Sequence, residues 1–237
     1  MQCLILAGGL ATRMRPLTET IPKALIPVGG VPFIDHQLGW LSRHGVTDVV
    51  LSIGYRGRML AAHVGDGARF GLAVRVVDEG DDLQGTAGAL RLADQQGALA
   101  PSFLVTYGDA FLPVDFAAVW DRFRACGRPA LMTVFRNDGR WDASNAIYEN
   151  GAVILYDKAH RTRPAAAFSY IDYGLLAFQR EAVRARVPPA GKADLADLCH
   201  ALSVSGQLAG MEIAERFYEI GSPAGLEDFE RWVSGRA

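Results

Sequence analysis

The chain has 237 residues, of which 50% are hydrophobic and 21% are charged, and its formal net charge is −2. This length and composition fit one large α/β domain with a full hydrophobic core. The near-neutral balance of charge excludes a general binder of nucleic acids or anionic membranes, so any site for anions has to be built locally.

The cysteines and the apolar segments indicate in which cellular compartment the protein is located. Cys3, Cys126 and Cys199 show neither metal-ligand spacing nor a pairing pattern, which predicts reduced thiols. The short apolar N-terminus lacks the basic flank of a signal peptide, and no stretch approaches the roughly 18 apolar residues of a membrane-spanning helix. We therefore expect a cytoplasmic protein whose partners include neither a membrane nor a nucleic acid.

Strands alternate with helices through the first 136 residues. Residues 2–7 form a continuous apolar run, typical of a parallel strand buried on both faces, and residues 33–44 carry apolar side chains at a helical spacing. The predicted strands are 2–7, 46–53, 72–78, 102–107 and 130–136, and the predicted helices are 33–44, 58–70, 86–95 and 115–125. This alternation predicts a doubly wound, mixed but mainly parallel sheet flanked by helices, with ligands at the carboxyl edge of the strands.

The pattern changes in the second half, where shorter strands are joined by turns. The predicted strands there are 144–148, 152–156, 170–178 and 210–215, and the predicted helices are 193–203 and 225–233. No internal repeat and no long linker separates the halves. We therefore predict a single domain over residues 1–237, in which residues 137–237 form a small β-rich extension that completes the cleft of residues 1–136.

The loop after the first strand combines backbone freedom with positive charge. Gly8 and Gly9 leave the backbone open to a ligand, and Arg13, Arg15 and Lys23 follow. Backbone N–H groups together with arginine suit a triphosphate, although a tight turn with surface arginines explains the same residues. The loop is neither a G-x-G-x-x-G fingerprint nor a Walker A loop.

A longer pattern points to a family. The stretch LAGGLATRMRPLTETIPKALIPVGGVPFI resembles the signature of the sugar-1-phosphate nucleotidylyltransferases, G-G-x-G-T-R-L-x-P-x-T followed by P-K-x-x-x-P, and departs from it at Ala11, where glycine is usual. Downstream, GTAGAL, YGDAF, YDKAH, YIDYGLLAF and YEIGSPAGL fit in the same order, so the resemblance covers nearly the whole chain. It implies a Rossmann-like nucleotidyltransferase fold, with a nucleotide-binding first half and a sugar-binding second half.

The resemblance also implies a reaction. A sugar 1-phosphate attacks the α-phosphorus of a nucleoside triphosphate, and NDP-sugar and pyrophosphate form. Because both reactants are anions, the site needs cations between them. By resemblance Arg13 holds the pyrophosphate and Lys23 contacts the α-phosphate or the attacking sugar phosphate. Arg15 orients the loop or is merely exposed, and without the resemblance Lys23 would be read as a solvated loop lysine.

Two carboxylates would hold the Mg²⁺ that the resemblance implies as cofactor. Asp109 follows Gly108 at the end of a buried strand, a position that also suits a helix N-cap or an Asx turn. Glu219 in YEIGSP stands where the family usually has aspartate, and its structural alternative is a surface carboxylate. Glutamate keeps the charge and the oxygen ligand that Mg²⁺ prefers.

The remaining site residues follow from the resemblance as well. Gln84 offers both a donor and an acceptor to a base edge, and Gly85 allows the base to approach closely. A carboxylate at Asp157 and an ammonium at Lys158 suit sugar hydroxyls and the 1-phosphate, although an exposed ion pair explains them equally. The predicted nucleotide-binding residues are Leu6, Ala7, Gly8, Gly9, Thr12, Gln84, Gly85 and Thr86. The predicted sugar-phosphate-binding residues are Gly108, Asn145, Asp157, Lys158 and Asp172.

The sequence does not decide which nucleobase and which sugar 1-phosphate the protein uses. The motif GTAG resembles guanylyltransferases for mannose- or heptose-type 1-phosphates, which favours guanine slightly. The opening half of the chain instead resembles uridylyltransferases that act on N-acetylmuramate 1-phosphate. Cytidylyl transfer to another sugar 1-phosphate is a further alternative. A non-catalytic relative is disfavoured because the cations and carboxylates are present. A glycosyltransferase is disfavoured by the lack of Asp-x-Asp, and an NAD-dependent oxidoreductase by the lack of its fingerprint. We expect a monomer or a homodimer.

Overall fold

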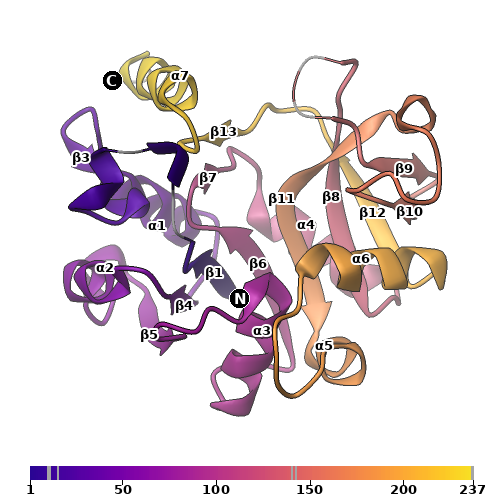
Figure 1. Cartoon of the computed structure of the whole chain (residues 1–237), viewed down its shortest axis with the longest axis horizontal. Coiled ribbons are helices and arrows are strands. Elements are labelled where there is room, and N and C mark those ends of the chain that lie inside the picture. The colour runs from indigo at the N-terminus through magenta and orange to yellow at the C-terminus, as the bar shows by residue number, and fades with distance from the viewer. Residues whose placement is uncertain (10–11, 15, 140, 142, 236–237) are drawn as a thin grey trace.

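The computed structural model describes residues 1–9, 12–14, 16–139, 141 and 143–235 (Figure 1). Its strands are β1 (Gln2–Ala7), β2 (Pro27–Val28), β3 (Val31–Pro32), β4 (Asp48–Ile53), β5 (Ala73–Asp78), β6 (Ser102–Tyr107), β7 (Ala110–Phe111), β8 (Ala130–Arg136), β9 (Ala146–Glu149), β10 (Ala152–Tyr156), β11 (Tyr170–Gln179), β12 (Leu208–Ile213) and β13 (Tyr218–Glu219). Its helices are α1 (Phe33–Arg43), α2 (Gly57–Val64), α3 (Gly85–Gln95), α4 (Phe116–Ala125), α5 (Arg180–Arg186), α6 (Leu195–Val204) and α7 (Pro223–Ser234). No described helix is both long and apolar enough to cross a membrane.

One nine-stranded sheet organises the molecule, in the order β5-β4-β1-β6-β11-β8-β12-β10-β9. The pairings of β5, β4, β1 and β6 are parallel, and so is that of β12 with β8. β11 is antiparallel to β6 and β8, and β10 is antiparallel to β12 and β9. Seven strands of this sheet therefore run one way, so the predicted mixed, mainly parallel sheet is confirmed. Of the strands in the second half, β9 to β12 belong to this same sheet, whereas β13 pairs with β7 in a separate two-stranded sheet.

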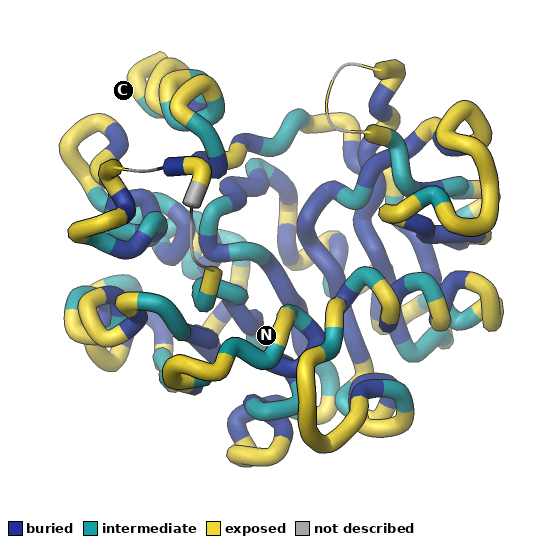
Figure 2. Tube along the Cα trace, in the orientation of Figure 1, coloured by how far each residue is buried: buried dark blue, intermediate teal, exposed yellow. Residues whose placement is uncertain are grey.

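Helices cover both faces of the sheet. The side chains of β1 alternate: Cys3 and Ile5 belong to the core beneath α1, α2 and α4, whereas Leu4 belongs to the core beneath α3, α5 and α6. Figure 2 shows the strands as the buried centre of the molecule and the outer faces of the helices as exposed. The continuous apolar run of residues 2–7 thus reflects burial on both sides of a parallel strand.

A third core ties the end of the chain to its beginning. Phe229 and Trp232 of α7 pack on Phe111 of β7, with ring centroids 4.8 Å and 4.9 Å apart. Phe33, at the start of α1, meets Phe229 edge-on at 5.2 Å. This packing, together with the pairing of β13 with β7, brings the YEIGSP segment next to the strand end that carries Asp109.

Most predicted bounds move by one or two residues, and the main differences concern two predicted elements and one helix that the sequence analysis missed. The helix predicted over 58–70 stops at Val64, because Gly65 has a positive φ of 63° and a Cβ on Gly67 would lie 2.3 Å from Val74. The predicted strand 210–215 begins two residues earlier, at Leu208, where the buried apolar run starts. The helix α5 was not predicted.

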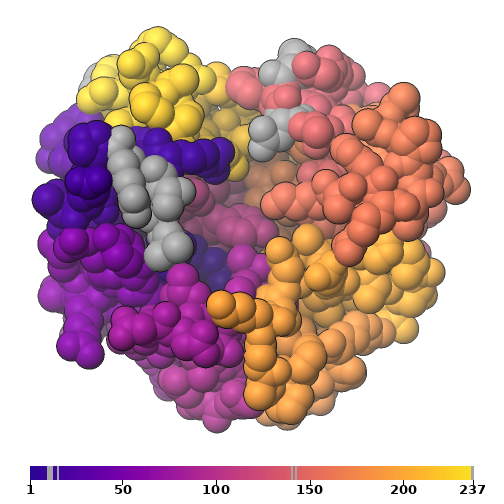
Figure 3. Space-filling model, viewed as in Figure 1, coloured from indigo at the N-terminus to yellow at the C-terminus, as the bar shows by residue number. Residues whose placement is uncertain are grey.

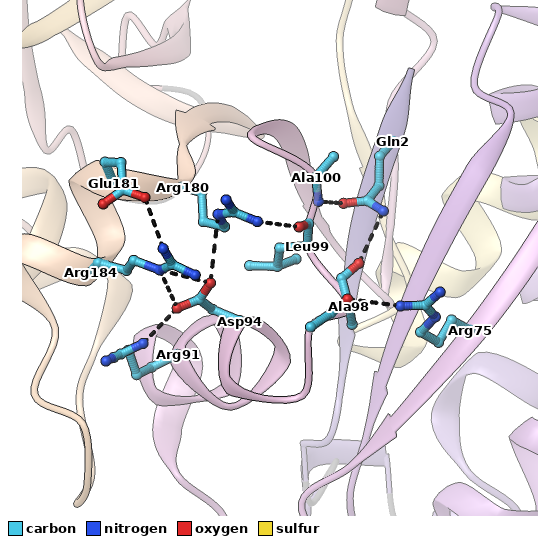
Figure 4. A network of polar contacts seen from close by, with 11 residues as sticks. Gln2, Arg75, Arg91, Asp94, Ala98, Leu99, Ala100, Arg180, Glu181 and Arg184 are labelled. Atoms are coloured by element: carbon cyan, nitrogen blue, oxygen red, sulfur yellow. Dashed lines mark hydrogen bonds and ion pairs between the residues drawn. The ribbon is translucent and has the colours of Figure 1, made fainter.

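A buried carboxylate joins α3 to α5. Asp94 of α3 lies between Arg91 of the same helix and Arg180 and Arg184 of α5 (Figure 4). Nε of Arg184 donates to both carboxylate oxygens, at 3.1 Å and 2.9 Å. The side chain of Asp94 is only 2% exposed. The network fixes α3, whose N-terminal end borders the cleft described next.

Candidate active site

A cleft opens at the carboxyl ends of β1 and β6, on the face that Figure 3 shows hollowed between the two halves of the chain. Its lining comes from four segments: Leu6, Ala7, Gly8 and Gly9 after β1; Pro22, Lys23 and Ala24; Glu79, Leu83, Gly85, Thr86 and Ala89 around the start of α3; and Tyr107, Gly108 and Asp109 after β6. The structure thus brings the first loop, the GTAGAL motif and the YGDAF motif together at one edge of the sheet.

Glycines let the walls of the cleft approach one another. A Cβ on Gly8 would lie 2.7 Å from Oε1 of Glu79, and a Cβ on Gly108 would lie 2.9 Å from the Cβ of Ala7. A side chain at position 108 would force the end of β1 to shift, whereas one at position 8 would displace the carboxylate of Glu79. The glycines therefore set the spacing of the cleft wall, in addition to exposing backbone groups.

Lys23 and Asp109 form an ion pair within the cleft. Nζ of Lys23 donates to Oδ2 of Asp109 at 2.7 Å, across 86 positions of sequence. Arg13 lies close by, because a Cβ on Gly221 would be 3.4 Å from an Arg13 guanidinium nitrogen and 3.9 Å from Oδ2 of Asp109. Two cations and a carboxylate thus converge where the β1 loop, β6 and the YEIGSP segment meet.

A second carboxylate, Glu219, lies on the strand next to the segment that carries Asp109. Glu219 is exposed and stands opposite Ala110 in the pairing of β13 with β7, and the N–H of Ile220 donates to the carbonyl of Asp109 at 2.9 Å. Asp109, just before β7, and Glu219, on β13, both carry carboxylate oxygens, the kind of hard ligand that Mg²⁺ prefers together with phosphate oxygens. No cluster of three or more histidine, cysteine, aspartate or glutamate ligands occurs among the described residues.

Glu79 was missed by the sequence analysis. It directly follows β5 and lines the cleft. Oε1 accepts a hydrogen bond from Ser52 at 3.3 Å, and Oε2 accepts one from the N–H of Gln84 at 2.9 Å. Burial raises the pKa of Glu79 despite these two donors. Its position at the carboxyl end of a parallel strand was the available signal.

Two residues of the predicted nucleotide site use their side chains elsewhere. Gln84 lines a second pocket beside α3, and its amide donates to the carbonyl of Asp82 at 2.6 Å. The hydroxyl of Thr86 donates to Asp194 at 3.1 Å and accepts from the N–H of Leu195 at 2.7 Å, so it links α3 to the start of α6. Thr86 still borders the cleft, whereas the side chain of Gln84 is turned toward its own loop.

Two of the predicted sugar-phosphate-binding residues, Asn145 and Asp172, are joined by a hydrogen bond. Oδ1 of Asn145 accepts from the N–H of Asp172 at 2.9 Å, and Oδ1 of Asp172 accepts from the N–H of Gly174 at 2.9 Å. Burial raises the pKa of Asp172 to about 6, although the Gly174 N–H and the charge of Lys158 counter it. Lys158 itself is exposed.

The carboxylate of Asp157 stabilises the turn that leads to Thr162. This carboxylate is buried and accepts two hydrogen bonds from Thr162, both at 2.7 Å. Burial acts against ionisation, but these bonds lower the pKa of Asp157 to about 2. In this structure Oδ2 of Asp157 shapes the loop, and a sugar contact through this carboxylate stays a prediction. Ala11 and Arg15 lie outside the described residues, as does the side chain of Thr12.

Comparison with known proteins agrees with this geometry. A family model described as nucleotidyl transferase matches residues 2–229. The chain is 28% identical over 236 residues to a mannose-1-phosphate guanylyltransferase of Mycobacterium tuberculosis, covering 98% of this chain and 63% of that protein. It is 37% identical over 120 residues to an N-acetylmuramate alpha-1-phosphate uridylyltransferase of Neisseria meningitidis serogroup B, covering 51% and 52%. It thus spans less than two thirds of these curated relatives.

Solved structures share the fold. HddC from Yersinia pseudotuberculosis, complexed with GMP-PN, superimposes with a TM-score of 0.80 at 21% identity, covering 98% of this chain and 99% of that one. The inositol-1-phosphate CTP transferase from T. maritima superimposes with a TM-score of 0.79 at 18% identity, covering 98% and 94%. The sequence motifs, the cleft and the match of residues 2–229 lead to one conclusion: the chain belongs to the nucleotidyl transferase family.

Proposed function

We propose that the protein transfers a nucleoside monophosphate from a nucleoside triphosphate to a sugar 1-phosphate. The observation that carries this proposal is the convergence of Lys23, Arg13 and Asp109 at the end of the glycine-walled cleft. An oxygen of the sugar phosphate bonds to the α-phosphorus while the bond from that phosphorus to the bridging oxygen of pyrophosphate breaks. Cations at this point reduce the repulsion between two anionic reactants.

Each charged residue has a place in this scheme. Lys23, held at the cleft wall, neutralises the α-phosphate or the incoming sugar phosphate. Arg13 takes the leaving pyrophosphate, whose charge grows as the bond breaks. Asp109 and Glu219 would hold Mg²⁺, which supplies further positive charge when bound. Asn145 and Asp172 meet the sugar hydroxyls, and Lys158 adds a cation on that side.

Guanine is the base we propose, because of Glu79. A carboxylate offers acceptors only, and two of the lone-pair positions on Glu79 remain after Ser52 and Gln84 have donated. Guanine presents two adjacent donors, N1–H and the N2 amino group. Uracil presents one donor between two carbonyl oxygens, which a carboxylate repels. Two added donors would also offset the burial that raises the pKa of Glu79. A mannose- or heptose-type sugar phosphate is the matching acceptor, in line with the guanylyltransferase relatives.

A substrate panel tests the proposal. The wild-type protein is incubated with Mg²⁺, each of GTP, UTP, CTP and ATP, and a set of sugar 1-phosphates, and pyrophosphate release is measured. We expect release only when a sugar phosphate is present, with GTP preferred. No release with any pair would contradict the proposed transfer. A preference for UTP or CTP would contradict the choice of guanine while leaving the transfer intact.

Glu79→Gln separates base reading from the rest of the reaction. An amide has one acceptor and one donor side, so it cannot accept from both the N1–H and the N2 amino group of guanine, whereas it can pair with the N3–H and a carbonyl oxygen of uracil. We expect this variant to lose its preference for GTP and to gain relative activity with UTP, measured as kcat/KM for each triphosphate. Asp81→Asn, the same chemical change at an exposed neighbouring residue, is the control and keeps the wild-type ranking. An unchanged ranking in Glu79→Gln would remove Glu79 from base recognition.

Location in a reducing cytoplasm is part of the same proposal. It is supported by Cys3, Cys126 and Cys199, which are free thiols in the structure. Nucleoside triphosphates and sugar phosphates are available in that compartment.

A further inference from the structure

The ion pair with Lys23 occupies one oxygen, Oδ2, of the Asp109 carboxylate that a metal would need. The atoms are 2.7 Å apart, and the side chains are 17% and 32% exposed. Lys23 begins a 3₁₀ turn, Lys23–Leu25, that is closed by hydrogen bonds from Leu25 to Pro22 and from Ile26 to Lys23. A hydrogen-bonded turn therefore holds the residue whose ammonium contacts the carboxylate directly.

A divalent cation that binds to Asp109 would be repelled by the positively charged side chains beside it. If a metal bound to Asp109 while Lys23 stayed in place, it would lie within a few ångströms of the ammonium, and Arg13 is also near. In a partly buried site such repulsion is weakly screened. The phosphates of a nucleotide change the balance, because they offer the ammonium an alternative anion in the same cleft.

We propose that Lys23 is the resident counter-cation of Asp109 in the nucleotide-free protein, and that nucleotide phosphates draw Lys23 away and so free Asp109 for the metal. This inference rests on the proposed function. It makes metal and nucleotide binding interdependent, with the nucleotide raising metal affinity and the metal raising nucleotide affinity by the same factor. Lys23 thereby has a second role, besides neutralising phosphate: it keeps the metal site closed to cations that arrive alone.

Binding of Mn²⁺ to the nucleotide-free protein tests the inference without any turnover. Free Mn²⁺ is measured by electron paramagnetic resonance for wild type, Lys23→Met and Lys23→Gln. We expect both variants to bind Mn²⁺ more tightly than wild type by about tenfold, a coupling of ordinary size between neighbouring sites. Lys23→Gln keeps a hydrogen-bond donor for Asp109, so it preserves the local fold if the methionine variant does not. Far-UV circular dichroism checks that each variant is folded.

Two controls locate the effect. Lys192→Met removes the same charge from a rim lysine that is 73% exposed, and it should bind Mn²⁺ like wild type. Adding Asp109→Asn to Lys23→Gln should abolish the gain. Equal Mn²⁺ affinity in wild type and both Lys23 variants would overturn the proposal. So would a gain that survives Asp109→Asn, or an equal gain in Lys192→Met.

Failure of this inference differs from failure of the proposed function. If the Lys23 variants bind Mn²⁺ as wild type does, and wild type releases pyrophosphate in the presence of a sugar phosphate, only the counter-cation role of Lys23 is contradicted. Tighter Mn²⁺ binding in those variants, with no release by wild type, supports the counter-cation role and contradicts the transfer.

Discussion

Two aspartates in the second half of the chain have opposite environments. Burial raises the pKa of Asp172 to about 6, whereas the hydrogen bonds from Thr162 outweigh burial and lower the pKa of Asp157 to about 2. Asp172 therefore costs the folded state free energy when it is ionised, and Asp157 stabilises it. Retaining a carboxylate that costs the folded state free energy is typical of a residue kept for binding or catalysis.

Asp172→Asn should stabilise the protein in a pH-dependent way. The folded-state pKa of Asp172 lies above the unfolded value of about 3.9, so its penalty is nearly absent below that value and complete above about pH 6. The amide keeps the acceptor for Gly174. We expect the free energy of unfolding to rise by about 2 to 3 kcal/mol at pH 8, and by less than about 1 kcal/mol at pH 4, in urea denaturation. Asp121→Asn, on the exposed face of α4, is the control; an equal change at both pH values would contradict the assignment.

Single residues show where sequence reasoning stops. Lys23 and Asp109 were expected in one site although 86 positions separate them, because the family resemblance assigns both to the reacting phosphates and their metal. Gln84 and Asp157 have side chains whose partners, Asp82 and Thr162, depend on local loop conformation that no motif encodes. Glu79 carries no motif signal, and only its position after β5 places it in the cleft.

At the scale of elements, the docking of α3 on α5 depends on one carboxylate. Asp94→Ala leaves Arg91, Arg180 and Arg184 crowded without their buried counter-ion. Removing one partner of a buried charge cluster costs about 3 to 5 kcal/mol, and the partial exposure of the arginines places the expected loss near about 3 kcal/mol. Chemical denaturation measures this loss.

Glu181→Ala supplies the control for that experiment. Glu181 pairs with Arg184 at 3.0 Å but is 72% exposed, so its removal should hardly change the midpoint of unfolding. Equal losses in the two variants would show that exposed ion pairs, not the buried Asp94, hold α5 in place.

Sequence patterns recovered buried elements better than exposed ones. The strands over 2–7, 102–107 and 130–136 have the predicted bounds, because parallel strands buried on both faces leave unbroken apolar runs. The helix α5 was not predicted because it has seven residues, of which only Ala182 and Val183 are buried. Its position depends on the contact with Asp94, which is 86 or more residues away in sequence.

At the scale of the whole molecule, strand order was the part that sequence could not supply. β11 lies between β6 and β8, so the chain returns from residue 170 to the middle of the sheet. Pairing of this kind is decided by long-range packing rather than by local propensity. β11, the strand that carries Asp172, pairs through residues 175–179 with β6, the strand that leads to Asp109, so the proposed sugar-binding and nucleotide-binding residues lie on neighbouring strands.

The central claim is that this cleft moves a nucleoside monophosphate to a sugar phosphate through the charges around Asp109. The most direct measurement follows NDP-sugar formation by ³¹P nuclear magnetic resonance, with GTP, Mg²⁺ and mannose 1-phosphate, in wild type and Asp109→Asn. We expect product with wild type and turnover lower by about two to three orders of magnitude in the variant, a loss of about 3 to 4 kcal/mol of transition-state stabilisation, at unchanged melting temperature. Near wild-type turnover in Asp109→Asn would contradict the account.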